Sequence, residues 1–140
     1  MQRYHVPKSA RTLTLLVAAA ALWWRPFRIA VDGQSMAPAL HQGDYLVATA
    51  RGRPRSGAIV VVERPDRPGL EIVKRVRAVP GEIAGGRLVE AGELWLTGDD
   101  PARSTDSRTF GVVARSAVRG VVRFRYWPPA RFGPIAPPPA

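Results

Sequence analysis

The sequence contains no cysteine and only two histidines, His5 and His41. The absence of cysteine excludes disulfides, thiolate metal sites and a cysteine nucleophile. Neither histidine lies in a cluster with Asp or Glu that resembles a set of metal ligands. We therefore expect no metal, no cofactor and no catalysis by imidazole, so any chemistry must come from hydroxyl, carboxylate, amine or guanidinium groups.

Lysine is almost as rare. Of the 21 basic residues, only Lys8 and Lys74 are lysine, and the other 19 are arginine. An arginine side chain stays protonated in proteins, whereas burial can lower the pKa of a lysine from about 10.4 toward neutrality and make it a base. Lys74 is therefore a candidate general base. The alternative is an ordinary strand lysine with a solvated ammonium group.

Acidic residues are also few, because 11 Asp and Glu leave a formal net charge of +10. This charge suits either nucleic acid or an anionic membrane surface. The arginines are scattered through strand-like and loop stretches and form no RNA-binding motif, and an apolar segment lies near the N-terminus. We therefore expect a lipid bilayer as a partner and no nucleic acid.

Residues 1–28 have the layout of a signal anchor. Three basic residues precede thirteen uncharged ones, residues 12–24, which end in Trp23 and Trp24. Basic residues stay on the cytoplasmic side and tryptophan prefers the membrane interface, so we expect a single-pass helix with the following domain outside the cytoplasm. Thirteen helical residues span only about 20 Å of a hydrocarbon core of about 30 Å. A cleaved signal peptide and a short core helix are the alternatives.

The residues after Val31 read as an all-β domain, since short apolar runs alternate with clusters of Gly, Pro and Asp. The expected strands are 46–50, 58–64, 71–79, 86–90, 94–96 and 118–126. In the third of these, Lys74 shares one face with Ile72, Val76 and Ala78, which would desolvate its amine. We expect one β domain over residues 29–127 and a Pro-rich tail over 128–140 that is disordered or extended.

Ser35 is the candidate nucleophile. It lies in Gly33-Gln34-Ser35-Met36-Ala37-Pro38, between a residue that permits a sharp bend and one that fixes φ. A serine beside the free amine of Lys74 would form a Ser-Lys dyad. Most serines in turns only hydrogen-bond their own backbone, so this short stretch needs support from the rest of the chain.

Four stretches in order resemble the boxes of the type I signal peptidases, which are membrane-anchored Ser-Lys endopeptidases. The segment 33–44 resembles the nucleophile box and 57–61 resembles the strand box that follows it. The segment 74–81 is similar to the general-base box, and 98–111 is similar to the last box. The resemblance implies an antiparallel β catalytic domain with Ser35 as nucleophile and Lys74 as base.

The resemblance also implies supporting roles. Ser104 would hydrogen-bond the Lys74 amine, and Asp106 would pair with Arg75 and Arg108 behind the dyad. The alternatives are a turn serine and a surface ion pair of little energetic value. The backbone N–H of Ser35 would bind the oxyanion. A substrate that binds as an added strand would meet apolar pockets, for which Met36, Leu40 and Ile72 are candidates, although core packing explains these three equally well.

Three departures from the family pattern stand out. Asp100 occupies the place where the family usually has Asn, and its charge would favour the ammonium form of Lys74. Gly33 lacks the hydroxyl with which some members help to hold the oxyanion, and one such donor is worth about 3 kcal/mol. The segment between the last two boxes is short, which implies a minimal catalytic core.

We therefore expect a monomeric, membrane-anchored serine endopeptidase that cuts signal peptides or pro-segments after small residues. A dedicated maturation protease with one client, such as those for nickel superoxide dismutase, is an alternative. Repressor-type self-cleaving proteases use a similar dyad but need a DNA-binding domain ahead of the serine, whereas here an apolar segment precedes it. A basic, non-enzymatic β module tethered to the membrane is the alternative outside the enzymes.

Overall fold

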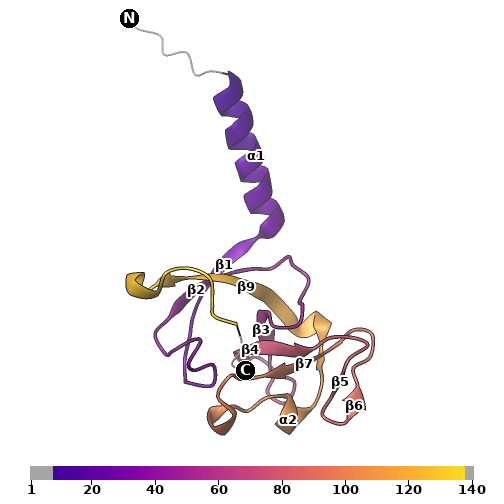
Figure 1. The fold of residues 1–140 in the computed structure, drawn as a ribbon. Coiled ribbons are helices and arrows are strands. Elements are labelled where there is room, and N and C mark those ends of the chain that lie inside the picture. The colour runs from indigo at the N-terminus through magenta and orange to yellow at the C-terminus, as the bar shows by residue number, and fades with distance from the viewer. Residues whose placement is uncertain (1–7, 138–140) are drawn as a thin grey trace, which may run out of the picture.

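The fold is an antiparallel β domain with one helix that stands away from it (Figure 1). The computed structural model describes residues 8–137, with side chains from residue 12 onward. Helix α1 (Lys8–Trp24) leads into a seven-stranded sheet of order β1-β2-β9-β3-β4-β7-β8. Its strands are β1 (Pro26–Ala30), β2 (Tyr45–Thr49), β3 (Ile59–Glu63), β4 (Glu71–Ala78), β7 (Glu93–Thr97), β8 (Val113–Ala114) and β9 (Val118–Trp127).

Several short elements complete the fold. Strands β5 (Ile83–Ala84) and β6 (Arg87–Leu88) form a separate hairpin. A 3₁₀ turn (Pro101–Arg103) and helix α2 (Ser107–Phe110) lie between β7 and β8, a second 3₁₀ turn spans Arg115–Ala117, and a third, Pro129–Arg131, follows β9. The mostly-β class expected from the sequence is confirmed, and each of the six predicted strands overlaps an observed strand.

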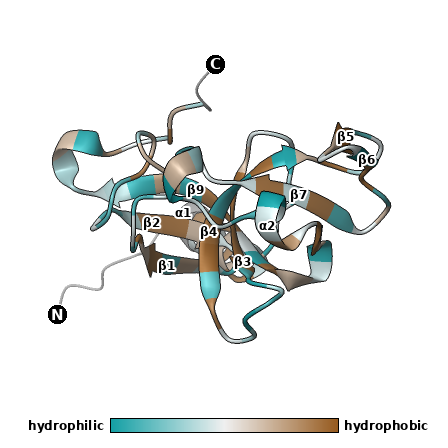
Figure 2. Ribbon diagram, turned by 90° about the horizontal axis from the view of Figure 1, so that it is seen from below, coloured by the Kyte–Doolittle hydropathy of each residue, from teal (hydrophilic) through white to brown (hydrophobic). Residues whose placement is uncertain are grey.

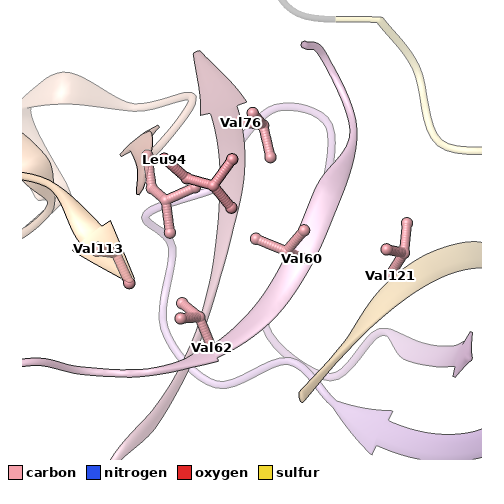
Figure 3. Close-up of a cluster of buried hydrophobic side chains, with 7 residues drawn as sticks. Val60, Val62, Val76, Leu94, Val113 and Val121 are labelled. Atoms are coloured by element: carbon pink, nitrogen blue, oxygen red, sulfur yellow. The ribbon is translucent and has the colours of Figure 1, made fainter. Parts of the chain in front are cut away.

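Three clusters of buried side chains hold the domain together. The first joins residues of five strands, Val60, Val62, Val76, Leu94, Leu96, Val113 and Val121 (Figure 3). The second packs the β1–β2 end of the sheet and contains Val31, Met36, Leu40, Leu46 and Ile59. The third lies under the β5–β6 hairpin and contains Ala78, Val89 and Trp95. Hydrophobic residues accordingly gather along β2, β4 and β7 when the sheet is seen from below (Figure 2).

The α1 region bears on one of the alternatives for the N-terminus. Leucine and tryptophan side chains between residues 13 and 24 are 56–78% exposed, so α1 is not a core helix. The first strand, β1, begins at Pro26 and pairs with β2. In the described part of the chain, no helix combines the length and the apolar character needed to cross a membrane.

The tail after β9 is not disordered as far as the structure describes it. Gly133 forms a two-way backbone bridge with Arg125, and Ile135 packs against the second cluster. In Figure 1 this yellow segment turns back from the end of β9 across the body of the domain. Proline prevents helix formation and inner-strand pairing but does not prevent packing against a sheet, so a Pro-rich segment can dock in this way. Residues 138–140 lie outside the described residues.

Candidate active site

Ser35 lies in the long connection between β1 and β2. The ends of this connection are joined where Val31 N–H donates to the Asp44 carbonyl at 2.8 Å and Gly43 N–H donates to the Val31 carbonyl at 2.9 Å. Gly33 adopts φ +83°, a conformation that favours glycine over residues with a side chain. We call residues 31–44 the nucleophile loop.

Lys74 faces Ser35 from β4. Its Nζ donates to Ser35 Oγ at 2.6 Å, across 39 positions of sequence. The lysine is only 4% exposed and lies opposite Val60 in the β3–β4 ladder. Ile72 and Val76, two positions away on either side, both pack in or against the first cluster, as the expected alternation of β4 required. The arrangement brings the two candidate dyad residues into hydrogen-bond contact.

The surroundings favour the neutral form of the lysine amine. Burial is the largest influence and lowers the pKa of Lys74 below its ordinary value. The Asp106 carboxylate opposes this shift and raises the pKa, while the Arg64 and Arg108 guanidinium groups lower it further. The net lowering of the pKa is the change that a lysine needs to act as a base.

Asp106 connects the residues that surround the dyad, which we call its supporting network. Its carboxylate is completely buried and accepts from Ser104 Oγ at 2.5 Å, from Gly98 N–H at 2.9 Å and from Arg108 Nη2 at 2.6 Å. Burial alone would raise the pKa of Asp106, but these hydrogen bonds outweigh it and hold the pKa well below its usual range. The expected Asp106–Arg108 pair is thus present. Ser104, in contrast, directs its hydroxyl to Asp106, and the described residues include no hydrogen bond from Ser104 to Lys74.

Arg75 does not pair with Asp106 as we expected. Its Nε and Nη2 donate to the two oxygens of Asp99 at 2.7 and 2.6 Å, and its Nη1 donates to the Gly57 carbonyl at 2.9 Å. Neighbouring residues of a strand point to opposite faces, so Arg75 cannot follow Lys74 toward Asp106. Asp99 is the residue that the sequence reasoning missed, although it stands inside the last box.

The last box lies directly against the nucleophile. Asp100 N–H donates to the Ser35 carbonyl at 3.0 Å. A methyl group on Gly98 would overlap the Ser35 carbonyl oxygen and the Ser104 hydroxyl, so this close approach requires glycine. The Asp100 side chain accepts from Ala102 N–H at 3.1 Å and is not among the groups that shift the pKa of Lys74, contrary to our expectation.

The three candidate pocket residues mainly belong to the core. Met36 and Leu40 are 2% and 0% exposed and anchor the nucleophile loop in the second cluster. Ile72 is half-buried against the first cluster. Their packing role, one of the two interpretations that the sequence allowed, is the one that the structure displays.

One half of β4 is an open edge beside the dyad. On the β7 side, β4 pairs from Arg75 onward, and β7 ends at Thr97 opposite Arg75. Val76 bonds to Ala58 and Gly57 on the β3 side, so the alternation of an antiparallel ladder directs the backbone of Val73 toward the other edge. No strand of the described residues pairs with Val73 there. An extended peptide laid along this edge would pass next to Lys74.

The candidate dyad residues do not line the large groove of the domain. A groove of about 1030 Å³ lies beside the β5–β6 hairpin, and Arg77, Trp95 and Asp99 are among its lining residues, whereas Ser35 and Lys74 are not. The described part of the chain also contains no group of His, Asp and Glu suited to a metal ion. The Ser35–Lys74 contact, rather than cavity volume, is therefore the reason for choosing this candidate site.

Comparison with known proteins shows the family of this chain. The family model described as signal peptidase, peptidase S26, matches residues 5–84 and 82–127. Mitochondrial inner membrane protease subunit 1 of Xenopus tropicalis is 33% identical over 118 residues, which cover 74% of this chain and 71% of that protein. Subunit 2 of the same protease from Danio rerio is 34% identical over 123 residues, covering 76% and 67% of the two chains. The chain is a member of the signal peptidase family, peptidase S26.

Proposed function

We propose that this protein is a membrane-bound serine endopeptidase in which Ser35 is the nucleophile and Lys74 is the general base. The observation that carries the proposal is the 2.6 Å contact between Lys74 Nζ and Ser35 Oγ at a lysine whose pKa is lowered by burial. Neutral Lys74 takes the proton of Ser35 Oγ as this oxygen bonds to the scissile carbonyl carbon. The Ser35 backbone N–H donates to the oxygen that becomes negative.

The same lysine completes the cycle. Its ammonium returns the proton to the departing amine, which leaves the acyl group on Ser35 Oγ. Lys74 then takes a proton from water as the water oxygen attacks the ester carbon, and Ser35 Oγ recovers a proton when the new carboxylate leaves. Ser104, Asp106 and Arg108 support the base by fixing the segment around Gly98, and Arg75 with Asp99 braces the next position of β4.

The substrate class follows from the open edge of β4. An extended polypeptide would bind as an added strand against Val73, with backbone hydrogen bonds supplying affinity and small pockets supplying specificity. Signal peptides and pro-segments of exported proteins fit this description, and one dedicated client is the narrower alternative.

Membrane association is the second part of the proposal. The relatives are named as inner membrane proteases, and α1 carries exposed leucine and tryptophan side chains. Three arginines that we call the arginine collar lie over aromatic rings where α1 meets the sheet. Arg51 stacks on Trp23 at 4.3 Å, Arg119 on Phe27 at 4.4 Å, and Arg123 on Trp24 at 5.7 Å. Guanidinium groups and amphipathic rings both favour the headgroup region of a bilayer.

We propose that residues 1–25 anchor the chain in the cell membrane with the N-terminus in the cytoplasm and the β domain outside it. A reporter fused after Tyr126 tests this topology, because activity only in the cytoplasm would reverse it, and a mature N-terminus near Ala21 would replace the anchor with a cleaved signal. We further propose that one chain suffices for catalysis, since all the dyad and supporting residues belong to it.

The decisive experiment compares purified parent protein with Ser35→Ala in detergent on a peptide containing Ala-x-Ala. We expect the variant to lose at least about a thousandfold in rate, because the remaining groups only stabilise the transition state. Ser116→Ala, at an exposed serine of the second 3₁₀ turn, is the matched control and should keep the parent rate. Equal cleavage by Ser35→Ala would show that the nucleophile is another residue.

A separate experiment identifies the protein substrates. Depletion of the protein, followed by sequencing of N-termini, should reveal the exported proteins whose leaders stay uncut. One affected protein would favour the dedicated maturation protease, and many would favour a general signal peptidase.

A further inference from the structure

The chain that follows β9 contacts both halves of the candidate active site. Residues 128–136 leave the end of the sheet at Trp127 and return toward β4, as the yellow segment of Figure 1 shows. One contact reaches the nucleophile loop and the other reaches the residue next to Lys74. These contacts lie outside the dyad and outside the supporting network of Asp106.

The first contact passes through Asp44, at the end of the nucleophile loop. Its carboxylate is completely buried and accepts from Arg131 Nη2 at 2.5 Å, from Arg125 Nη1 at 3.1 Å and from His41 N–H at 3.0 Å. A buried carboxylate that loses a cationic partner is strongly unfavourable, so Asp44 and the two arginines form one unit. Arg131 comes from the returning segment and Arg125 from β9.

Arg125 carries this unit into the loop itself. Its Nη1 also donates to the Ala39 carbonyl at 3.0 Å, and its Nε donates to the Arg131 carbonyl at 2.6 Å. Ala39 lies four residues after Ser35, between the buried anchors Met36 and Leu40. The returning segment, the buried carboxylate and the loop that bears the nucleophile are therefore linked by consecutive hydrogen bonds.

The second contact lies on the base side. The Ala136 carbonyl accepts from Arg75 Nη2 at 3.1 Å, and the same nitrogen donates to Asp99. Between the two contacts, Ile135 packs against the cluster that holds Met36 and Leu40. The segment thus touches the nucleophile loop through Arg131 and the base-bearing strand through Ala136.

We propose that residues 128–136 are a C-terminal clamp that sets the position of Ser35 relative to Lys74. Arg131 of the clamp and Arg125 of β9 are the positioning residues, which act through Asp44 and the Ala39 carbonyl without touching substrate. The distance between a nucleophile and its base affects turnover steeply, since a displacement of about 1 Å costs about a hundredfold. Loss of the clamp therefore lowers kcat and leaves KM nearly unchanged, because the open edge of β4 does not depend on it. Its effect on turnover rests on the proposed function, whereas its effect on the loop does not.

Met36 provides a local probe of this effect. It follows Ser35 directly, it is buried, and it is one of only two methionines in the chain. Protein labelled with ¹³C at the methionine methyl groups therefore reports the packing of the nucleophile loop by NMR. The test compares Arg131→Ala with Arg87→Ala in full-length protein, because both side chains are partly exposed and each forms an ion pair, with Asp44 and Glu93 respectively.

We expect Arg131→Ala to shift the Met36 methyl signal and to lower kcat about tenfold, with KM changed less than about twofold. Arg131→Lys keeps a cation next to Asp44, so its Met36 signal and its kcat should be close to those of the parent. Arg87→Ala should change neither the Met36 signal nor kcat. A chain that ends at Trp127 should show a larger loss than Arg131→Ala, whereas a chain that ends at Pro137 should match the parent.

Two results would overturn the clamp. One is an unchanged Met36 signal and an unchanged kcat in folded Arg131→Ala. The other is a loss in Arg131→Ala that Arg87→Ala reproduces. If the shorter chain does not fold, the point variants decide alone. A shifted Met36 signal in a protein without peptidase activity would support the clamp and contradict the proposed function.

Discussion

The backbone amide of Asp100 donates to the carbonyl oxygen of Ser35 at 3.0 Å, so the last box of the sequence is bonded directly to the nucleophile. This bond places Gly98 between the Ser35 carbonyl and the Ser104 hydroxyl. The segment around Gly98 therefore contacts the Ser35 backbone and limits where it can lie.

Gly98→Ala should therefore abolish activity by moving Ser35. The added methyl group overlaps both neighbours, and we expect kcat to fall by at least about a hundredfold. Gly86→Ala is a control for backbone strain without steric overlap, because φ at Gly86 is +76° while a Cβ there meets no atom within 4 Å, and it should keep the parent kcat. A kcat equal to that of the parent in Gly98→Ala would mean that the segment around Gly98 can move without displacing Ser35 from Lys74.

Lys74→Arg tests whether the site needs a base or a cation. The variant keeps the positive charge but cannot deprotonate, so it should be as inactive as Lys74→Ala. The parent rate should rise with pH through the lowered pKa of Lys74, because only the neutral amine accepts the Ser35 proton. Cleavage by Lys74→Arg at a tenth of the parent rate, or a rate independent of pH, would refute the general-base role.

Asp106→Asn should change both the pH profile and the stability. Removal of its charge takes away the influence that raises the pKa of Lys74, so the midpoint of the pH–rate curve should move to lower pH. Asp100→Asn should leave that midpoint in place, because Asp100 caps Ala102 instead of facing the amine. If the midpoint moved only in Asp100→Asn, Asp100 and not Asp106 would be the carboxylate that raises the pKa of Lys74.

The stability effect of Asp106 has a definite sign. Its pKa is lowered in the folded state, so its contribution is complete above the unfolded value of about 3.9 and is lost as the pH falls through the folded value. Urea unfolding at pH 7 should show Asp106→Asn less stable by about 3 kcal/mol, because a buried ion pair loses one partner. Below pH 4 the gap between parent and variant should narrow, and a constant gap would contradict the assignment.

A pair of proline substitutions tests the open edge of β4. Val73→Pro removes an N–H that faces the edge, so it should raise KM for an extended peptide at least about fivefold while the fold survives. Ile72→Pro removes an N–H that bonds to β3 and should lower the melting temperature instead. Equal KM values for parent and Val73→Pro would move the substrate to another surface.

The arginine collar predicts binding to anionic vesicles. Each arginine near such a surface contributes about 1 kcal/mol, so Arg51→Gln with Arg123→Gln should weaken flotation with phosphatidylserine vesicles about 10- to 30-fold. Arg77→Gln with Arg87→Gln removes the same charge elsewhere and should have a smaller effect. The difference in vesicle binding between the two double variants should shrink as salt is added. Equal losses of binding in the two would mean that net charge, and not the position of the collar, determines binding.

The local pattern of the sequence predicts much of this molecule. Alternating β4 placed Lys74 among apolar neighbours, and the rarity of lysine distinguished it from the arginines. The partner of Arg75 was wrong because that expectation followed box order, although the alternation of β4 already puts Arg75 on the face opposite Lys74. Ser104 was misassigned toward Lys74 for a related reason, since the stronger acceptor, the Asp106 carboxylate, is two residues away.

The tail and β1 were beyond the reach of such patterns. Proline-rich composition argues against regular structure, but the docking of residues 128–137 depends on the buried charge of Asp44 and on a free hydrophobic site for Ile135. Strand β1 is only five residues long, and its pairing with β2 depends on contacts that the local sequence does not reveal.

The strand order has a consequence for how the protein is made. Strand β9 lies between β2 and β3, so among the described strands it alone joins the half that bears Ser35 to the half that bears Lys74. It is also the last of the described strands along the chain, and its pairings connect residues far apart in the sequence. Contacts of this kind form late, because loop closure costs entropy before it is rewarded. We therefore expect a nascent chain that lacks β9 to carry both candidate dyad residues without aligning them, and to gain peptidase activity only after β9 has been translated.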